Sequence, residues 1–175
     1  MSIPNIFLVG PMGAGKSAVG RQLARMLKRD FYDSDAEIEA RTGVDIPFIF
    51  EKEGESGFRR REREVIDALT ALDGIVLATG GGAVLDPGNR ELLASRGLVV
   101  YLDASVDQQL ERTRLSSHRP LLDTPNPAER LAILMQERAP IYRELATLTV
   151  HTDGRMVREV AQEVRRRLAA MSKDS

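Results

Sequence analysis

The sequence predicts a single α/β domain of three layers, in which a parallel sheet of about five strands is covered by helices on both faces. Three observations carry this prediction. Short apolar segments of strand length recur along the chain, segments with helical spacing lie between them, and a glycine-rich loop follows the first apolar segment. The length of 175 residues suits one such domain.

Strands are predicted where the chain is apolar over several consecutive residues, because strands of a parallel sheet are buried on both faces. In order, these are residues 6–9, a shorter segment at 31–32, then 75–78, 98–102 and 148–150. Helices are predicted where apolar residues recur every three or four positions. These positions are Val19, Leu23 and Leu27; Val65, Ile66, Leu69 and Leu72; Leu131, Leu134, Ile141 and Leu145; and Val157, Val160, Val164 and Leu168.

Two intervals break the alternation of strands and helices. Residues 33–73 hold helical patterns with no strand between them, and residues 112–126 are polar and interrupted by prolines. We expect residues 33–63 to form a helical insertion over the binding edge of the sheet and residues 112–126 to form a mobile lid. An ordinary surface loop is the alternative for the second interval.

Composition excludes several classes of function. The chain has 25 Lys and Arg against 26 Asp and Glu, so it offers no broad basic surface for nucleic acid or an anionic membrane. The absence of cysteine excludes disulfides and thiolate zinc sites. No apolar run approaches the roughly 20 residues that span a bilayer. We expect a soluble, cytoplasmic protein with no nucleic-acid or membrane partner, and a monomer as the default.

The loop at residues 10–17, Gly-Pro-Met-Gly-Ala-Gly-Lys-Ser, has the spacing of a Walker A phosphate loop. Backbone N–H groups of such a loop surround the phosphates, the lysine adds a positive charge, and the serine hydroxyl binds Mg²⁺. The following helix directs its positive end at the same anion. A glycine-rich turn with a solvated lysine would not explain the order of strand, loop and helix. We therefore predict nucleotide binding at Gly13, Ala14, Gly15, Lys16, Ser17 and Ala18.

Asp33 and Asp35 follow the second predicted strand two positions apart. If the extended conformation continues through them, both carboxylates face the same side of the chain. One could then serve a metal ion and the other a substrate. Alternatively, Asp35 could cap a helix that begins at Ala36. The two residues alone leave this choice open.

Arg138 lies on an apolar helical stripe, seven residues after Leu131 and three before Ile141. A cation that faces a core or a cleft needs an anion, because a buried charge without a partner destabilises the folded protein by roughly several kcal/mol. A bound carboxylate satisfies the guanidinium with two charge-assisted hydrogen bonds. Pro140 interrupts the hydrogen-bond ladder of this helix, and we expect this to turn the segment toward the cleft.

Arg59 lies near the start of a predicted helix, where the helix dipole disfavours cations, so helix stability does not explain it. It shares a helix face with Ile66, and we favour ligand contact for it. The neighbouring charges are interpreted as a solvated face of mutual partners, comprising Arg60, Arg61, Arg63, Glu62 and Glu64.

The run Thr79-Gly-Gly-Gly82 directly follows the predicted strand 75–78, at the edge where parallel sheets bind ligands. Three glycines expose backbone donors without side chains in the way. A tight turn is the alternative. The position beside the phosphate-loop strand favours a functional interpretation.

Six segments together resemble shikimate kinases. They are the phosphate loop, Asp33-Ser-Asp35, Phe58-Arg59, Ala78-Thr-Gly-Gly-Gly82, Arg119-Pro-Leu-Leu122 and Glu137-Arg-Ala-Pro-Ile-Tyr142. Beyond the phosphate loop each is weak alone, but six in order at fitting separations are specific, and they span nearly the whole chain. The resemblance implies one kinase domain over residues 1–175, strand order 2-3-1-4-5, and transfer of the γ-phosphoryl group of ATP to the 3-hydroxyl of shikimate.

The resemblance also implies roles for the residues of the acceptor site. The shikimate carboxylate would lie between Arg59 and Arg138, with Gly81 near them. Asp35 would hold the ring hydroxyls and orient or deprotonate the 3-hydroxyl. A kinase for gluconate or a nucleoside monophosphate, and a nucleotide-binding regulator without turnover, are the alternatives.

On the ATP side, the resemblance implies that Ser17 binds Mg²⁺ directly and that Asp33 reaches it through water. Lys16 and the lid residue Arg119 would balance charge on the transferring phosphoryl group. Arg112 and Arg155 correspond to positions that flank the adenine. The chain departs from the family at Ala18, where threonine is common, and its lid segment Leu115-Ser-Ser-His118 lacks the glycines of many relatives.

Overall fold

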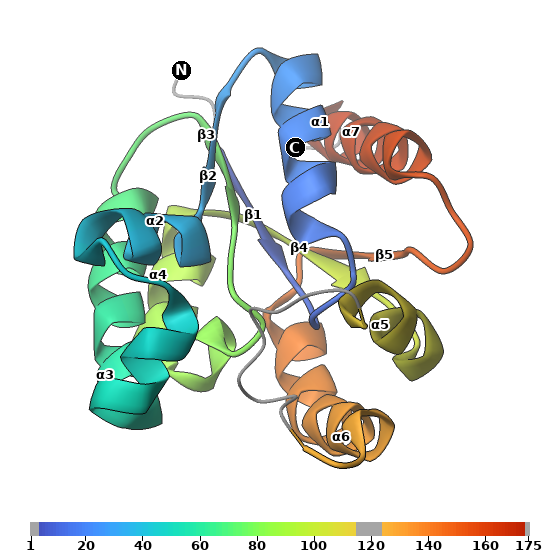
Figure 1. Ribbon diagram of the computed structural model, residues 1–175. Coiled ribbons are helices and arrows are strands. Elements are labelled where there is room, and N and C mark those ends of the chain that lie inside the picture. The colour runs from blue at the N-terminus through green and yellow to red at the C-terminus, as the bar shows by residue number, and fades with distance from the viewer. Residues whose placement is uncertain (1–3, 115–123, 174–175) are drawn as a thin grey trace.

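The computed structural model describes residues 4–114 and 124–173, and its strands and helices alternate as predicted (Figure 1). The elements in order are β1 Asn5–Val9, α1 Lys16–Leu27, β2 Asp30–Asp33, α2 Ser34–Thr42, α3 Ile46–Thr70, β3 Ile75–Ala78, the short 3₁₀ helix η1 Ala83–Leu85, α4 Pro87–Arg96, β4 Gly97–Asp103, α5 Val106–Thr113, α6 Pro127–Leu145, β5 Leu148–His151 and α7 Val157–Lys173. Among the residues described, no helix is both long enough and apolar enough to cross a membrane.

The sheet is parallel and has five strands in the order β2-β3-β1-β4-β5, which confirms the predicted order. In the central strand, Ile6 lies opposite Val76 of β3 and Leu98 of β4. β2 and β4 are longer than the apolar runs that predicted them, because their ends at the rim of the sheet are polar or partly exposed. The strand order reverses at β1, and such a point is where open parallel sheets bind ligands.

Helices cover both faces of the sheet, as predicted. Phe7 and Val9 of β1 belong to a core that the sheet shares with α3, α4 and α6. Ile6 and Leu8 belong to the opposite core, which α1 and α7 complete. Figure 1 shows α1 and α7 together on one side of the strands, with α3 and α4 on the other. The alternation of side chains along β1 therefore produces the three layers.

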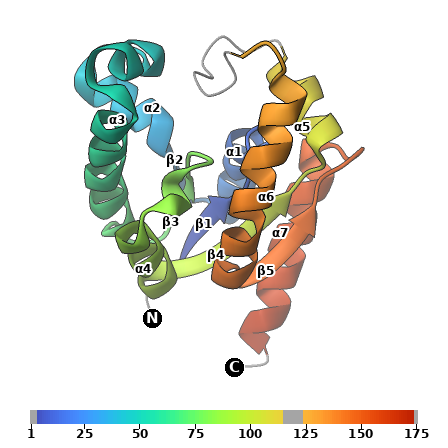
Figure 2. The same cartoon turned by 90° about the horizontal axis from the view of Figure 1, so that it is seen from below.

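The interval after β2 contains helices and no strand, as the pattern predicted. α2 and α3 follow β2 directly, and Gly54, with φ 71° and ψ −177°, breaks α3 into two parts. This conformation is essentially restricted to glycine. Seen from below, α2 and α3 stand on one side of the strands and α5 and α6 on the other (Figure 2).

Pro140 removes one hydrogen bond from the ladder of its helix, as expected, but it does not end the helix. α6 runs from Pro127 to Leu145 with Pro140 inside it. Pro140 is exposed, while its neighbours Arg138, Ala139 and Tyr142 are buried. Packing on both sides of the proline holds the helix in place despite one lost backbone hydrogen bond.

Candidate active site

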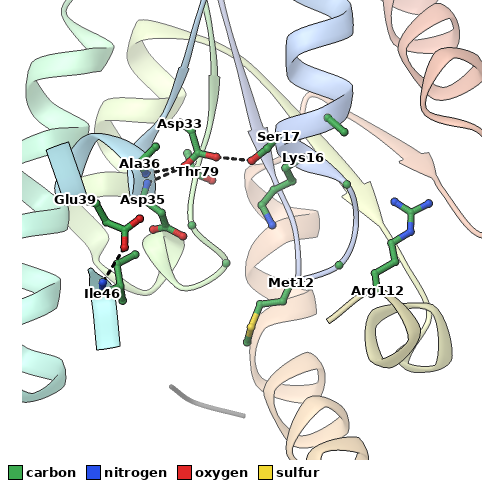
Figure 3. A pocket seen from close by; sticks show the side chains of 15 residues that line it. Met12, Lys16, Ser17, Asp33, Asp35, Ala36, Glu39, Ile46, Thr79 and Arg112 are labelled. Carbon is green, nitrogen blue, oxygen red and sulfur yellow. Dashed lines mark hydrogen bonds between the residues drawn. The ribbon is translucent and has the colours of Figure 1, made fainter. Parts of the chain in front are cut away.

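A pocket of about 420 Å³ opens at the carboxyl ends of β1, β2 and β3 (Figure 3). Its walls are the phosphate loop, the start of α2, Ile46, the glycine run and one arginine of α5. The predicted site residues that line it are Gly13, Gly15, Lys16, Ser17, Ala18, Asp33, Asp35, Gly81 and Arg112. The structure thus gathers residues from four separate segments at the edge where the sequence placed them.

The phosphate loop leads from β1 into α1 through two left-handed glycines, Gly13 with φ 78° and Gly15 with φ 89°. Lys16 Nζ donates to the carbonyl oxygens of Gly10 and Pro11, each at 2.8 Å. Ala14 is fully buried, and its N–H donates to the Pro11 carbonyl at 3.3 Å. The side chain of Lys16 therefore lies along its own loop, at the N-terminus of α1.

Asp33 joins the second strand to the phosphate loop. One of its carboxylate oxygens accepts from the N–H groups of Asp35 at 2.9 Å and Ala36 at 3.1 Å, which caps α2. The other oxygen accepts from the Ser17 hydroxyl. The sequence argument is corrected here: the extended conformation ends at Asp33, and Asp33 rather than Asp35 is the cap. Both aspartates nevertheless line the pocket.

The paired oxygens of Ser17 and Asp33 suit a magnesium ion. Mg²⁺ prefers hard oxygen ligands, and it is held by one or two protein groups together with phosphates and water. Within residues 4–114 and 124–173, no group of three or more His, Asp or Glu side chains forms an all-protein metal site. A hydroxyl and a carboxylate beside a phosphate loop are a donor set that fits a nucleotide-bound Mg²⁺.

Buried charges surround the glycine run. Arg138 is 4 % exposed and Glu62 is 1 % exposed, and Arg59 Nη1 lies 3.0 Å from Glu62 Oε1. A Cβ placed on Gly81 would lie 3.6 Å from Arg138 Nη1, and one placed on Gly82 would lie 2.3 Å from Arg59 Nη2. The structure therefore brings both predicted arginines to the glycine run, although neither lines the pocket at the phosphate loop.

Glu62 is a site residue that the sequence argument missed. It was interpreted as part of a solvated face, but it is buried, and desolvation raises its pKa to about 7 even though the charge of Arg59 opposes the rise. The nearby charge of Asp35 adds to the increase in its pKa. The spacing of Arg59 and Glu62, three positions apart on one helix, was the available signal.

Three buried polar atoms in this cluster lack a hydrogen-bond partner among the residues described: Arg59 Nε, Arg138 Nε and Glu62 Oε2. Buried polar groups normally have hydrogen-bond partners, so atoms of this kind at a pocket wall indicate a place for a polar ligand.

Two other arginines of α3, Arg61 and Arg63, have different partners from those expected. Arg61 pairs with Glu53 at 2.7 Å, and Arg63 pairs with Asp86 at 2.6 Å.

The two arginines predicted near the adenine have different surroundings. Arg112 of α5 lines the pocket beside the phosphate loop, where a Cβ on Gly15 would lie 2.7 Å from its Nη1. Arg155 pairs with Glu163 at 2.8 Å and donates to the His151 carbonyl at 2.9 Å, and it is not part of the pocket lining. Arg119 and most of the predicted lid at 112–126 lie outside the described residues.

Known proteins resemble this chain over nearly its whole length. The family model for shikimate kinase matches residues 12–169. A shikimate kinase of Halorhodospira halophila is 60 % identical over 159 residues, which are 91 % of this chain and 90 % of the relative. A solved structure of shikimate kinase from Acinetobacter baumannii in complex with shikimate superposes with a TM-score of 0.95 at 52 % identity, covering 96 % of this chain and 94 % of that one. The chain belongs to the shikimate kinase family.

Proposed function

We propose that the pocket and the glycine run together carry out the reaction of the family, in which ATP phosphorylates the 3-hydroxyl of shikimate to give shikimate 3-phosphate and ADP. The chain is an ATP-dependent shikimate kinase. One observation carries the assignment of residues. A phosphate loop and two clustered arginines, one of them deeply buried, meet at a single glycine-lined wall, so a triphosphate and a small carboxylic acid fit side by side.

ATP binds at the phosphate loop. Its β- and γ-phosphates take the backbone N–H groups of residues 13–18, and Lys16 exchanges its two carbonyl partners for phosphate oxygens. Ser17 directly and Asp33 through water would hold Mg²⁺, which would supply charge neutralisation for the phosphates. Arg112 and Arg155 flank the adenine. The lining position of Arg112 supports its role, whereas Arg155 must leave its pairing with Glu163 to act.

Shikimate binds on the other side of the glycine run. Arg59 and Arg138 hold its carboxylate, and the unsatisfied Nε atoms of both guanidinium groups support this assignment. Asp35 holds the ring hydroxyls; this assignment is supported by its place in the pocket lining with the phosphate loop and by the effect of its charge on Glu62. The acceptor hydroxyl is thereby directed at the γ-phosphate.

In the transfer step, the 3-hydroxyl oxygen of shikimate forms a bond to the γ-phosphorus while the bond from that phosphorus to the β–γ bridging oxygen breaks. The hydroxyl proton passes to the Asp35 carboxylate. Lys16 and Arg119 balance the charge that spreads over the phosphoryl oxygens. Holding the two reactants in line contributes about 7–11 kcal/mol to such reactions. Closure of residues 112–126 would exclude water, which would otherwise hydrolyse ATP.

The cellular setting follows from the proposed activity. We propose the cytoplasm as the compartment of this chain, in keeping with its small-molecule reactants. The site as described needs residues from one chain alone, which fits a monomer. The balance of 25 basic and 26 acidic residues supports the absence of a nucleic-acid partner.

A panel of acceptors tests the proposal. We expect ADP release from Mg-ATP to require shikimate, and to be at least 100-fold slower with gluconate or with nucleoside monophosphates, because about 3 kcal/mol separates a well-held carboxylate from a misplaced one. Equal rates on all acceptors would contradict the proposal. Nucleotide binding without turnover on any of them would favour a regulator.

A further inference from the structure

The glycine run that forms the shared wall is fixed by hydroxyl groups on both of its sides. The Ser34 hydroxyl, fully buried at the start of α2, accepts from the Gly80 N–H at 3.0 Å. The Tyr142 hydroxyl, fully buried on α6, donates to the Gly81 carbonyl at 2.5 Å. The run is therefore attached to the helix that begins next to Asp35 and to the helix that carries Arg138.

The backbone of Gly81 depends on these attachments. The carbonyl of Gly80 already accepts from the Ala83 N–H at 3.0 Å, which fixes the peptide plane before Gly81. The peptide plane after Gly81 contains the carbonyl that accepts from Tyr142. Because a peptide unit is planar, the orientation of a carbonyl also sets that of the N–H that follows it. A glycine has no side chain to restrict its backbone dihedral angles. Here the hydrogen bond from the Tyr142 hydroxyl fixes the orientation of the peptide unit that follows Gly81.

Tyr142 lies four positions after Arg138, on the same face of α6. Burial raises the pKa of Tyr142 to about 12, even though the positive charge of the nearby Arg138 opposes this rise. The hydroxyl is therefore protonated throughout the physiological range and available as a donor. One helix thus supplies both a guanidinium beside Gly81 and the hydroxyl bonded to the Gly81 carbonyl.

We propose that Tyr142 is a positioning residue for shikimate, whose hydroxyl sets the distance between the glycine run and the Arg138 guanidinium. This inference rests on the proposed function, in which Arg138 and Gly81 hold the acceptor. Tyr142 acts through these two groups and does not touch the reacting atoms. Loss of the Tyr142 hydroxyl weakens acceptor binding and leaves the phosphate loop intact.

Tyr101 offers a matched control. It packs against Tyr142 with ring centroids 5.0 Å apart, and it is also buried. Its hydroxyl, however, donates to Asp103 at 2.9 Å, and Asp103 does not line the pocket. Tyr142→Phe and Tyr101→Phe therefore remove the same group from the same packed pair, and only the first breaks a bond to the glycine run.

Steady-state kinetics and thermal melting of the two variants test the inference. For Tyr142→Phe we expect a rise of about 3- to 10-fold in the KM for shikimate, the value of one hydrogen bond, with kcat and the KM for ATP within about twofold. Tyr101→Phe should leave all three constants unchanged, while both variants melt at lower temperature than the parent. An unchanged shikimate KM in Tyr142→Phe, or an equal rise in both variants, overturns the inference. Failure of the parent to phosphorylate shikimate would instead overturn the proposed function.

Discussion

At the scale of single residues, the site combines buried ionisable groups, each of which would destabilise the folded protein if it had no partner. Arg138 and Glu62 are buried ionisable groups on different helices, and each lies within reach of Arg59, of the glycine run, or of both. An unpaired buried charge destabilises a protein by about 3–5 kcal/mol when its partner is removed. The carboxylate of the proposed acceptor would complete the cluster.

Arg138→Ala tests the carboxylate clamp. We expect the KM for shikimate to rise by a factor that corresponds to about 2–4 kcal/mol, because a desolvated charge pair is lost. The KM for ATP should change little, since Arg138 does not line the phosphate-loop pocket. Arg143→Ala removes the same charge from an exposed position of the same helix and should be neutral. Steady-state kinetics with each substrate varied in turn would decide, and an unchanged shikimate KM would exclude the clamp.

Asp35→Asn tests the proton acceptor. The substitution keeps the shape of the side chain but removes its basicity, so we expect kcat at saturating shikimate to fall by about 100-fold. The exposed Asp73→Asn is the control for the charge change. Turnover of Asp35→Asn at the parent rate would show that this carboxylate has no part in the step.

Glu62 predicts a particular pH dependence of stability. Burial raises its pKa from 4.5 to about 7, so between these values the folded protein holds a proton that the unfolded chain has lost. The free energy of unfolding must therefore fall as pH rises through this window, by about 3 kcal/mol for an isolated group. Glu62→Gln should lack this decline, whereas the exposed Glu64→Gln should retain it. Urea denaturation from pH 4.5 to 8 measures both, and the same decline in all three proteins would refute the assignment.

At the scale of elements, the sequence predicted the strands better than the start of α2 or the burial of residues on α3. Residues 6–9 and 75–78 were predicted as strands, because uninterrupted apolar runs have few other interpretations in a chain of this kind. The start of α2 was left open, with Asp35 as one possible cap, and the N–H groups of Asp35 and Ala36 that donate to Asp33 identify Asp33 as the cap. Glu62 was misassigned because burial depends on how α3 lies against the sheet, which local spacing does not report.

The break in α3 at Gly54 gives a prediction at this scale. Its φ of 71° and ψ of −177° suit only glycine, and no atom within 4 Å would obstruct a Cβ there. Gly54→Ala should therefore destabilise the protein by about 1–3 kcal/mol through backbone strain alone. Ser56→Ala, at an exposed position two residues further along, should cost nothing measurable. Urea denaturation compares the two, and a Gly54→Ala variant as stable as the parent would show that the break is not required.

At the scale of the whole molecule, the sheet topology places two binding functions next to each other. The reversal of strand order at β1 puts the phosphate loop beside the end of β3, where the glycine run begins. The insertion α2–α3 and the helix α6 then bring carboxylates and arginines to that run from opposite sides (Figure 2). A donor and an acceptor held at one edge in this way can exchange a phosphoryl group directly.

Phosphorus NMR of one reaction mixture tests this direct transfer. With Mg-ATP, shikimate and the purified protein, we expect a phosphomonoester resonance coupled to the ring proton at C3 to grow in step with ADP, with little inorganic phosphate. Inorganic phosphate appearing in step with ADP, with no phosphomonoester, would contradict the account, because it would mean that the γ-phosphoryl group passes to water.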